Sequence, residues 1–123
     1  PHNCVENCVC YAGTHDNVPL ALWRQEAEPE EIDFAVQYLG LNEREGFNRG
    51  VLRGGMTSPA SLFVAQMQDW LELGEGSRIN TPGTGGDNWQ WRLLPGELTV
   101  KLIGDIREMT RIYGRLPAKQ SKT

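Results

Sequence analysis

The residues in this sequence whose side chains are best suited to catalysis or ligand binding are four consecutive polar ones, Thr14, His15, Asp16 and Asn17. They follow a stretch over residues 3–11 that is rich in Val, Cys and Tyr and predicts a β-strand. In α/β folds, ligands bind just past the carboxyl ends of strands. A carboxylate placed there can stabilise a developing positive charge or hold sugar hydroxyls, and a neighbouring imidazole can contact the same ligand. The simpler interpretation is that these side chains cap the helix that follows.

The three cysteines do not have the spacing of a metal site. Cys4, Cys8 and Cys10 would share one face of the predicted strand. At about 3.3 Å per residue, Cys4 and Cys8 lie roughly 13 Å apart, too far for one zinc ion with bonds of about 2.3 Å. We therefore expect no metal site and interpret these residues as structural thiols. An odd and small number of cysteines also argues against a disulfide framework and favours a reducing, cytoplasmic setting.

Two segments further along could line a binding face. Residues 80–86 (NTPGTGG) lack the Gly-Lys-Ser/Thr ending of a phosphate-binding loop, so we interpret them as a shaped loop. Trp89 and Trp91 would face the same side of an extended segment and could form a flat platform for sugar rings, or they could belong to the core. No Ser or Thr has the His and Asp partners of a hydrolase triad.

The elements around these residues alternate between strands and helices. Helices are predicted over residues 20–26, from Pro29 to a cap at Gly40, over 43–55 and over 95–113, where Gly114 ends the last one. The apolar run 61–67 favours a strand buried on both faces, although a helix over 58–71 competes. Residues 74–88, rich in Gly and polar residues, predict a long irregular loop.

This order predicts an α/β fold with a parallel sheet. The chain has 123 residues and a net charge of −4, which argues against a nucleic-acid or anionic-membrane binder, and no apolar stretch is long enough to span a bilayer. Two strands cannot close a (β/α)8 barrel, which needs about 250 residues. Because the chain begins at Pro1 rather than Met, we expect a piece of a larger architecture. Residues 1–114 should form its folded part and residues 115–123 a polar, disordered tail.

Four short motifs follow one another along the chain: YAGTHDN (residues 11–17), AQMQD (65–69), RINTPGT (78–84) and NWQWR (88–92). In this order they resemble the C-terminal part of the 4-α-glucanotransferases of glycoside hydrolase family 77, the amylomaltases or disproportionating enzymes. The resemblance implies a (β/α)8 barrel whose seventh and eighth strands are the two predicted here. It also implies transfer of α-1,4-glucan segments between maltooligosaccharides by a retaining double displacement, with no metal or organic cofactor.

The resemblance assigns roles to four residues. Asp16 corresponds to the family's third catalytic carboxylate, which holds the donor sugar in its distorted transition state. His15 corresponds to a sugar-contacting imidazole. Asn80 and Pro82 belong to a loop that borders the sugar cleft and binds substrate. A hydrogen bond from such a carboxylate to the sugar 2-OH strengthens as positive charge develops.

The sequence departs from the family in what it lacks. Nothing in it matches the nucleophile or the acid/base motif, so we expect the isolated chain to be inactive on maltotriose. Val18 and Pro19 also differ from the acidic and hydroxyl residues common after Asn17. A non-catalytic carbohydrate-binding module with a Trp platform is the alternative function. Unpaired strand edges and apolar faces would also favour self-association.

Overall fold

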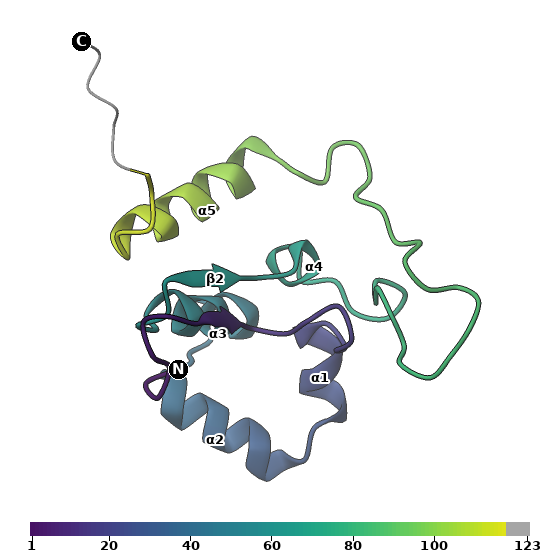
Figure 1. Cartoon of the computed structure of the whole chain (residues 1–123), viewed down its shortest axis with the longest axis horizontal. Helices are drawn as coiled ribbons and strands as arrows, with labels where there is room; N and C mark the ends of the chain where they lie inside the picture. Colours follow the sequence, from purple (N-terminus) through teal and green to yellow (C-terminus); the bar gives the residue numbers. More distant parts are fainter. Residues whose placement is uncertain (118–123) are drawn as a thin grey trace.

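The computed structural model describes residues 1–117 as a set of short helices around a small parallel sheet (Figure 1). The elements in chain order are β1 (Val9–Tyr11), α1 (Leu20–Glu26), α2 (Pro29–Leu39), α3 (Phe47–Met56), β2 (Leu62–Val64), α4 (Met67–Trp70) and α5 (Val100–Ile112). Strands β1 and β2 run parallel, with Val9 opposite Leu62 and Tyr11 opposite Val64. The α/β class and the parallel pairing predicted from the sequence are confirmed.

Helix α3 lies at the centre of the packing. Leu52 and Met56 of α3 form the core with Trp70 of α4 and Leu102 of α5. Phe63 of β2 packs against the same cluster. In Figure 1, α5 lies on one side of the sheet and α1 and α2 lie on the other. The elements that precede and follow β2 thus converge on one hydrophobic core.

The glycines of α3 allow this close packing. A Cβ atom on Gly55 would overlap the ring of Phe63, and one on Gly54 would lie 2.6 Å from a methyl carbon of Leu39. Glycine lowers the intrinsic stability of a helix, as expected for the predicted segment 43–55, but here it lets a strand and a helix approach the backbone. The helix begins four residues later than predicted, at Phe47.

The sequence predicted the ends of α1 and α2 correctly but not the start of α5. Helices α1 and α2 have the predicted bounds, and Gly40 ends α2 in the left-handed conformation at φ 65°. The predicted start of the last helix at Pro95 is wrong. The Thr99 hydroxyl accepts a hydrogen bond from the Leu102 N–H at 3.1 Å, which makes Thr99 the N-cap and starts α5 at Val100.

The strands are shorter and more exposed than predicted. Residues 3–8 are not strand: the Cys8 N–H donates locally to the Glu6 carbonyl, and although the Ser61 N–H also reaches that carbonyl, the regular pairing with β2 begins only at Val9. The competing helix over 58–71 exists only as α4. The prediction that the second strand is buried on both faces is also wrong, since Leu62 and Val64 are exposed.

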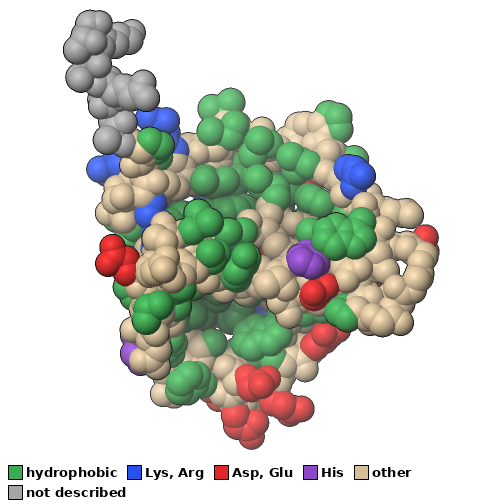
Figure 2. Space-filling view, in the orientation of Figure 1, with side chains coloured by type: hydrophobic (Ala, Val, Ile, Leu, Met, Phe, Trp, Pro, Cys, Tyr) green, Lys and Arg blue, Asp and Glu red, His purple; other side chains and the backbone are tan. Residues whose placement is uncertain are grey.

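One face of the sheet therefore presents apolar side chains to solvent. Val9 and Tyr11 of β1 are exposed opposite Leu62 and Val64 of β2 in the register, while Cys10 and Phe63 between them point to the other face and are half-buried. Hydrophobic side chains gather on the face shown in Figure 2, over the strands and beneath α5. Within the described part of the chain, these four residues remain 38–53% exposed.

Arg115 belongs to the folded unit although the sequence placed it in the tail. Its guanidinium donates hydrogen bonds to the carbonyls of Met56 (2.9 Å), Ser58 (2.8 Å) and Ala60 (3.0 Å). These contacts tie the chain after α5 to the segment between α3 and β2. The predicted disorder is thus wrong for Arg115, and residues 118–123 of the predicted tail lie outside the described residues.

Cys4, Cys8 and Cys10 are free thiols and half-buried. Among residues 1–117, no three His, Cys, Asp or Glu side chains come together as metal ligands would. In the same part of the chain, no helix is both long and apolar enough to cross a membrane.

Candidate functional site

The loop between β1 and α1 presents Asp16 at the carboxyl end of the first strand. The Asn17 side-chain oxygen accepts hydrogen bonds from the N–H (2.8 Å) and the hydroxyl (3.0 Å) of Thr14. The Thr14 hydroxyl in turn accepts from the Asp16 N–H at 3.3 Å. These bonds form a tight polar turn, which leaves the Asp16 side chain 48% exposed.

These residues do not cap helix α1. Pro19 occupies the N-cap position and has no side-chain hydrogen bond to offer. The Leu20 N–H instead donates to Asp69 Oδ1 at 2.8 Å. The simpler interpretation of Thr14, Asp16 and Asn17 as helix caps is therefore wrong: the Thr14 and Asn17 side chains shape the turn that presents Asp16.

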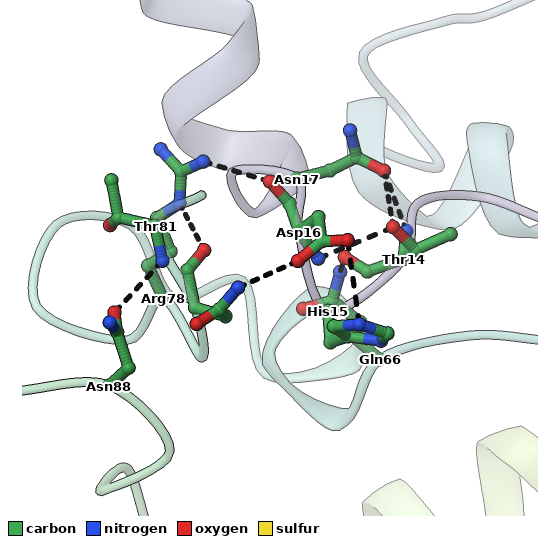
Figure 3. Close-up of polar contacts among 9 residues, drawn as sticks. Thr14, His15, Asp16, Asn17, Gln66, Arg78, Thr81 and Asn88 are labelled. Carbon is green, nitrogen blue, oxygen red and sulfur yellow. Dashed lines mark hydrogen bonds and ion pairs between the residues drawn. The ribbon is translucent and has the colours of Figure 1, made fainter. Parts of the chain in front are cut away.

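A second loop, which follows α4, holds the Asp16 carboxylate (Figure 3). Asn80 Nδ2 donates to Asp16 Oδ1 at 2.7 Å, and Arg78 Nη2 donates to the Asp16 backbone carbonyl at 2.8 Å. Arg78 Nε also bonds the Asn80 carbonyl at 2.9 Å, so the two residues act together. An ionised carboxylate has about four acceptor positions, and Asn80 uses one of them. Asp16 thus keeps capacity to accept hydrogen bonds from a ligand.

His15 lies between Asp16 and Trp89. Its Nε2 is 3.5 Å from Asp16 Oδ2, and its imidazole ring is 4.8 Å from the Trp89 ring at an interplanar angle of 40°. The His15 carbonyl also accepts a hydrogen bond from the Asn80 N–H at 3.2 Å. Trp89 is 55% exposed. The prediction left open whether this tryptophan is core or platform, and within the described residues it lies outside the core.

Two residues that follow β2 support the Asp16 loop from the side of the sheet. Gln66 Nε2 donates to the Thr14 carbonyl at 2.7 Å, and Asp69 binds Leu20 at the other end of the loop. Asp69 is 1% exposed. Burial raises the pKa of its carboxyl, and the hydrogen bond from the Leu20 N–H lowers it by less.

The long loop closes on itself next to Asp16. The Trp89 N–H donates to the Ile79 carbonyl at 2.7 Å, and the Thr81 N–H donates to the Asn88 side chain at 2.9 Å. Asn88 Nδ2 also reaches the carbonyl and the hydroxyl of Thr84, each at 3.1 Å. The irregular loop predicted over 74–88 is thus ordered by its own polar side chains, as in a compact Ω-loop.

The fold brings together His15, Asp16 and Asn80 of the predicted site residues. Pro82 is exposed on the same loop and, within the described residues, takes no part in the hydrogen bonds around Asp16. The sequence assigned no role to the residues that position the loops, namely Arg78, Gln66 and Asp69. Arg78 and Gln66 lie in the motifs that follow β2, but their targets are more than 50 positions away in the sequence.

Comparison with known proteins supports the resemblance of the motifs. The sequence profile of glycoside hydrolase family 77, described as 4-alpha-glucanotransferase, matches residues 1–99. This chain belongs to that family. The motifs of this glycoside hydrolase family 77 chain that surround Asp16, Gln66, Asn80 and Trp89 all fall within the matched region.

Several 4-alpha-glucanotransferases are related to this family 77 chain over most of its length. It is 46% identical over 116 residues to the protein of Clostridium butyricum and 39% identical over 123 residues to that of Thermus thermophilus. Each alignment covers 94% of this chain and about a quarter of the relative, at 24% and 25%. The chain therefore spans about a quarter of the length of the curated relatives that it matches.

A solved structure extends the comparison to three dimensions. The amylomaltase from Streptococcus agalactiae, solved in complex with acarbose, superposes on this family 77 chain with a TM-score of 0.90 at 36% identity. The match covers 95% of this chain and 24% of the amylomaltase. The predicted fold, a portion of a (β/α)8 barrel, is confirmed by this similarity.

Proposed function

We propose that this chain is the part of a 4-α-glucanotransferase that supplies the transition-state-stabilising carboxylate, Asp16. The observation that carries the proposal is the exposed Asp16 carboxylate, held at the carboxyl end of β1 by the 2.7 Å hydrogen bond from Asn80. Preorganised charge at such a position stabilises a cationic transition state without reorganising during the reaction. Membership of the family supports the assignment.

The reaction proposed is a retaining transfer of α-1,4-glucan segments between maltooligosaccharides. A nucleophile and an acid/base, placed about 5–5.5 Å apart around the sugar, pass it through a covalent glycosyl-enzyme intermediate. Those two carboxylates lie outside this chain. Asp16 accepts a hydrogen bond from a sugar hydroxyl that strengthens as the oxocarbenium-like charge develops, and His15, Asn80 and Pro82 contact the sugar.

The exposed face of the sheet fits a place inside a larger barrel. We propose that Val9, Tyr11, Leu62 and Val64 pack against the remaining barrel strands, since four neighbouring apolar side chains rarely stay in solvent. The isolated chain should then self-associate and show no transfer on maltotriose. Sedimentation analysis of the 123-residue chain tests this, and a stable monomer at low concentration would contradict it. Three free thiols favour a reducing, cytoplasmic compartment. The proposed transfer between maltooligosaccharides assigns the protein to carbohydrate metabolism.

The function is tested in a chimeric enzyme, in which this chain replaces the matching segment of the Clostridium butyricum relative. Transfer is followed as glucose release and chain elongation from maltotriose. The Asp16→Asn variant should lose about 10²–10³-fold in kcat, because it removes a charge that acts in the transition state. The matched control is Asp87→Asn, an exposed carboxylate of the long loop over residues 74–88, and it should retain full activity.

An Asp16→Asn enzyme that stays within a few fold of the parent would overturn the proposal. The result would be equally damaging if Asp87→Asn lost as much activity, because the effect would then reflect charge in general. Binding of maltooligosaccharides by the isolated chain would favour the carbohydrate-binding module instead. Titration of its Trp fluorescence with maltoheptaose measures this directly.

A further inference from the structure

Trp89 has an unusual backbone and an unusual environment. Its φ of 62° places it in the left-handed region, which bulky L-residues rarely adopt. Its side chain is exposed, yet one part of the ring lies against the His15 imidazole at a centroid distance of 4.8 Å. A large aromatic side chain gains most by burial, so both features need a reason.

The chain fixes this conformation from both sides. The Trp89 N–H donates to the Ile79 carbonyl at 2.7 Å, and the Trp89 carbonyl accepts from Arg92 Nη1 at 3.1 Å. The preceding residue, Asn88, is anchored to Thr81 and Thr84. Disfavoured backbone conformations that are held in this way concentrate at functional sites. The strained backbone at Trp89 therefore lowers the stability of the loop, but it keeps the indole beside His15 and Asp16.

We propose that the exposed indole face of Trp89 is a stacking platform for a glucose ring next to the ring held at Asp16. Glucose rings present apolar C–H faces, which pack well on flat aromatic surfaces, while their hydroxyls need polar partners at the edge. Here His15 and Asp16 supply that polar edge directly beside the indole. This inference rests on the proposed function and adds a second sugar-contacting side chain to it.

A single ring forms the platform. The sequence hypothesis paired Trp89 with Trp91 on one side of an extended segment, but the left-handed φ of Trp89 breaks that extended backbone. Trp91 is half-buried, and its carbonyl accepts from Arg92 Nη1 at 2.9 Å, so Arg92 is engaged with the backbone. The stacking role falls to Trp89.

The test compares three variants of the chimeric enzyme. Trp89→Leu keeps apolar bulk but removes the flat face, whereas Trp89→Phe keeps a flat face. Phe34→Leu is the matched control, because Phe34 is an exposed aromatic on α2 that stacks on Tyr38 instead of His15. Two quantities are measured for each variant: the dissociation constant for acarbose by calorimetry and the KM and kcat for maltotriose.

Trp89→Leu should weaken acarbose binding and raise KM by about 3- to 10-fold, the range expected for the loss of one aromatic stacking contact. Trp89→Phe should keep the acarbose dissociation constant and the KM close to those of the parent, and Phe34→Leu should match the parent in both constants. Equal constants for Trp89→Leu and Phe34→Leu would overturn the proposal. So would a fall in kcat alone, which would make Trp89 only a positioning residue for His15.

Failure of this inference is distinct from failure of the proposed function. The acarbose constant is an equilibrium measurement and does not depend on whether Asp16 is catalytic. An active Asp16→Asn enzyme would refute the function, whatever the result for Trp89. Unchanged acarbose binding by Trp89→Leu, with Asp16→Asn inactive, would refute the platform alone.

Discussion

Asp69 Oδ1 accepts the backbone N–H of Leu20 at 2.8 Å, so a buried carboxylate that follows β2 caps helix α1 across 49 positions of sequence. Pro19, at the N-cap, cannot do this with its own side chain. Gln66 binds the Thr14 carbonyl at the opposite end of the same loop. The loop that presents Asp16 is therefore held at both ends by residues of one short segment after the second strand.

Removing this cap should destabilise the protein. Asp69→Ala leaves the buried Leu20 N–H without a partner and should lower the free energy of unfolding by about 1–2 kcal/mol. Asp69→Asn retains an acceptor oxygen and should cost much less. Urea denaturation of the chimeric enzyme and its two variants measures both effects. Equal losses for Ala and Asn would show that the charge, not the hydrogen bond, matters at this position.

The same carboxyl should give the protein a specific pH dependence. Because burial raises the folded-state pKa of Asp69 above its unfolded value, the folded state binds more protons in the interval between the two values. The contribution of Asp69 to stability should therefore decrease as pH rises through that interval and stay constant above it. Asp69→Asn should remove this component. It is measured as the difference in unfolding free energy between parent and variant at pH 4 to 8, and a difference that does not change with pH contradicts the prediction.

The hydrogen bond from Asn80 to Asp16 should matter for catalysis more than for folding. Asn80→Ala removes the donor that orients the Asp16 carboxylate, and we expect kcat of the chimeric enzyme to fall by about 10- to 100-fold. Gln90→Ala, an exposed amide of the same loop region, is the control and should leave kcat unchanged. Steady-state transfer from maltotriose measures both. Normal kcat in Asn80→Ala would show that Asp16 is oriented by other groups.

Replacement by alanine should have opposite effects on stability at a tightly packed helical glycine, Gly55, and at an unpacked one, Gly104. Gly55→Ala forces a methyl group into the ring of Phe63 and should destabilise by about 1–3 kcal/mol through overpacking. An added Cβ on Gly104, inside α5, would meet open space, so Gly104→Ala should stabilise by about 0.5–1 kcal/mol. Thermal unfolding of the two variants distinguishes close approach from simple backbone flexibility. A Gly55→Ala protein as stable as the parent would mean that Phe63 has room to move.

Local sequence signals determined helices α1 and α2 and the irregular character of the long loop. Pro29 fits the first turn of a helix and Gly40 adopts the left-handed conformation that ends one, and both effects act within a few residues. The start of α5 was missed because the decisive cap is the hydroxyl of Thr99, four residues after the proline that suggested a helix start. The motif that contains Asp16 was also evident from the sequence.

Only the tertiary structure decided which side chains meet. Asn80 reaches Asp16 across 64 positions and Asp69 reaches Leu20 across 49, contacts that depend on the parallel pairing of β1 and β2. The exposure of the sheet face and the position of Trp89 beside His15 also depend on how distant segments of the chain are arranged. Short-range patterns encode turns and caps, because those bonds join near neighbours in the chain. Contacts between distant segments depend on how the strands pair and how the core packs, which no local pattern records.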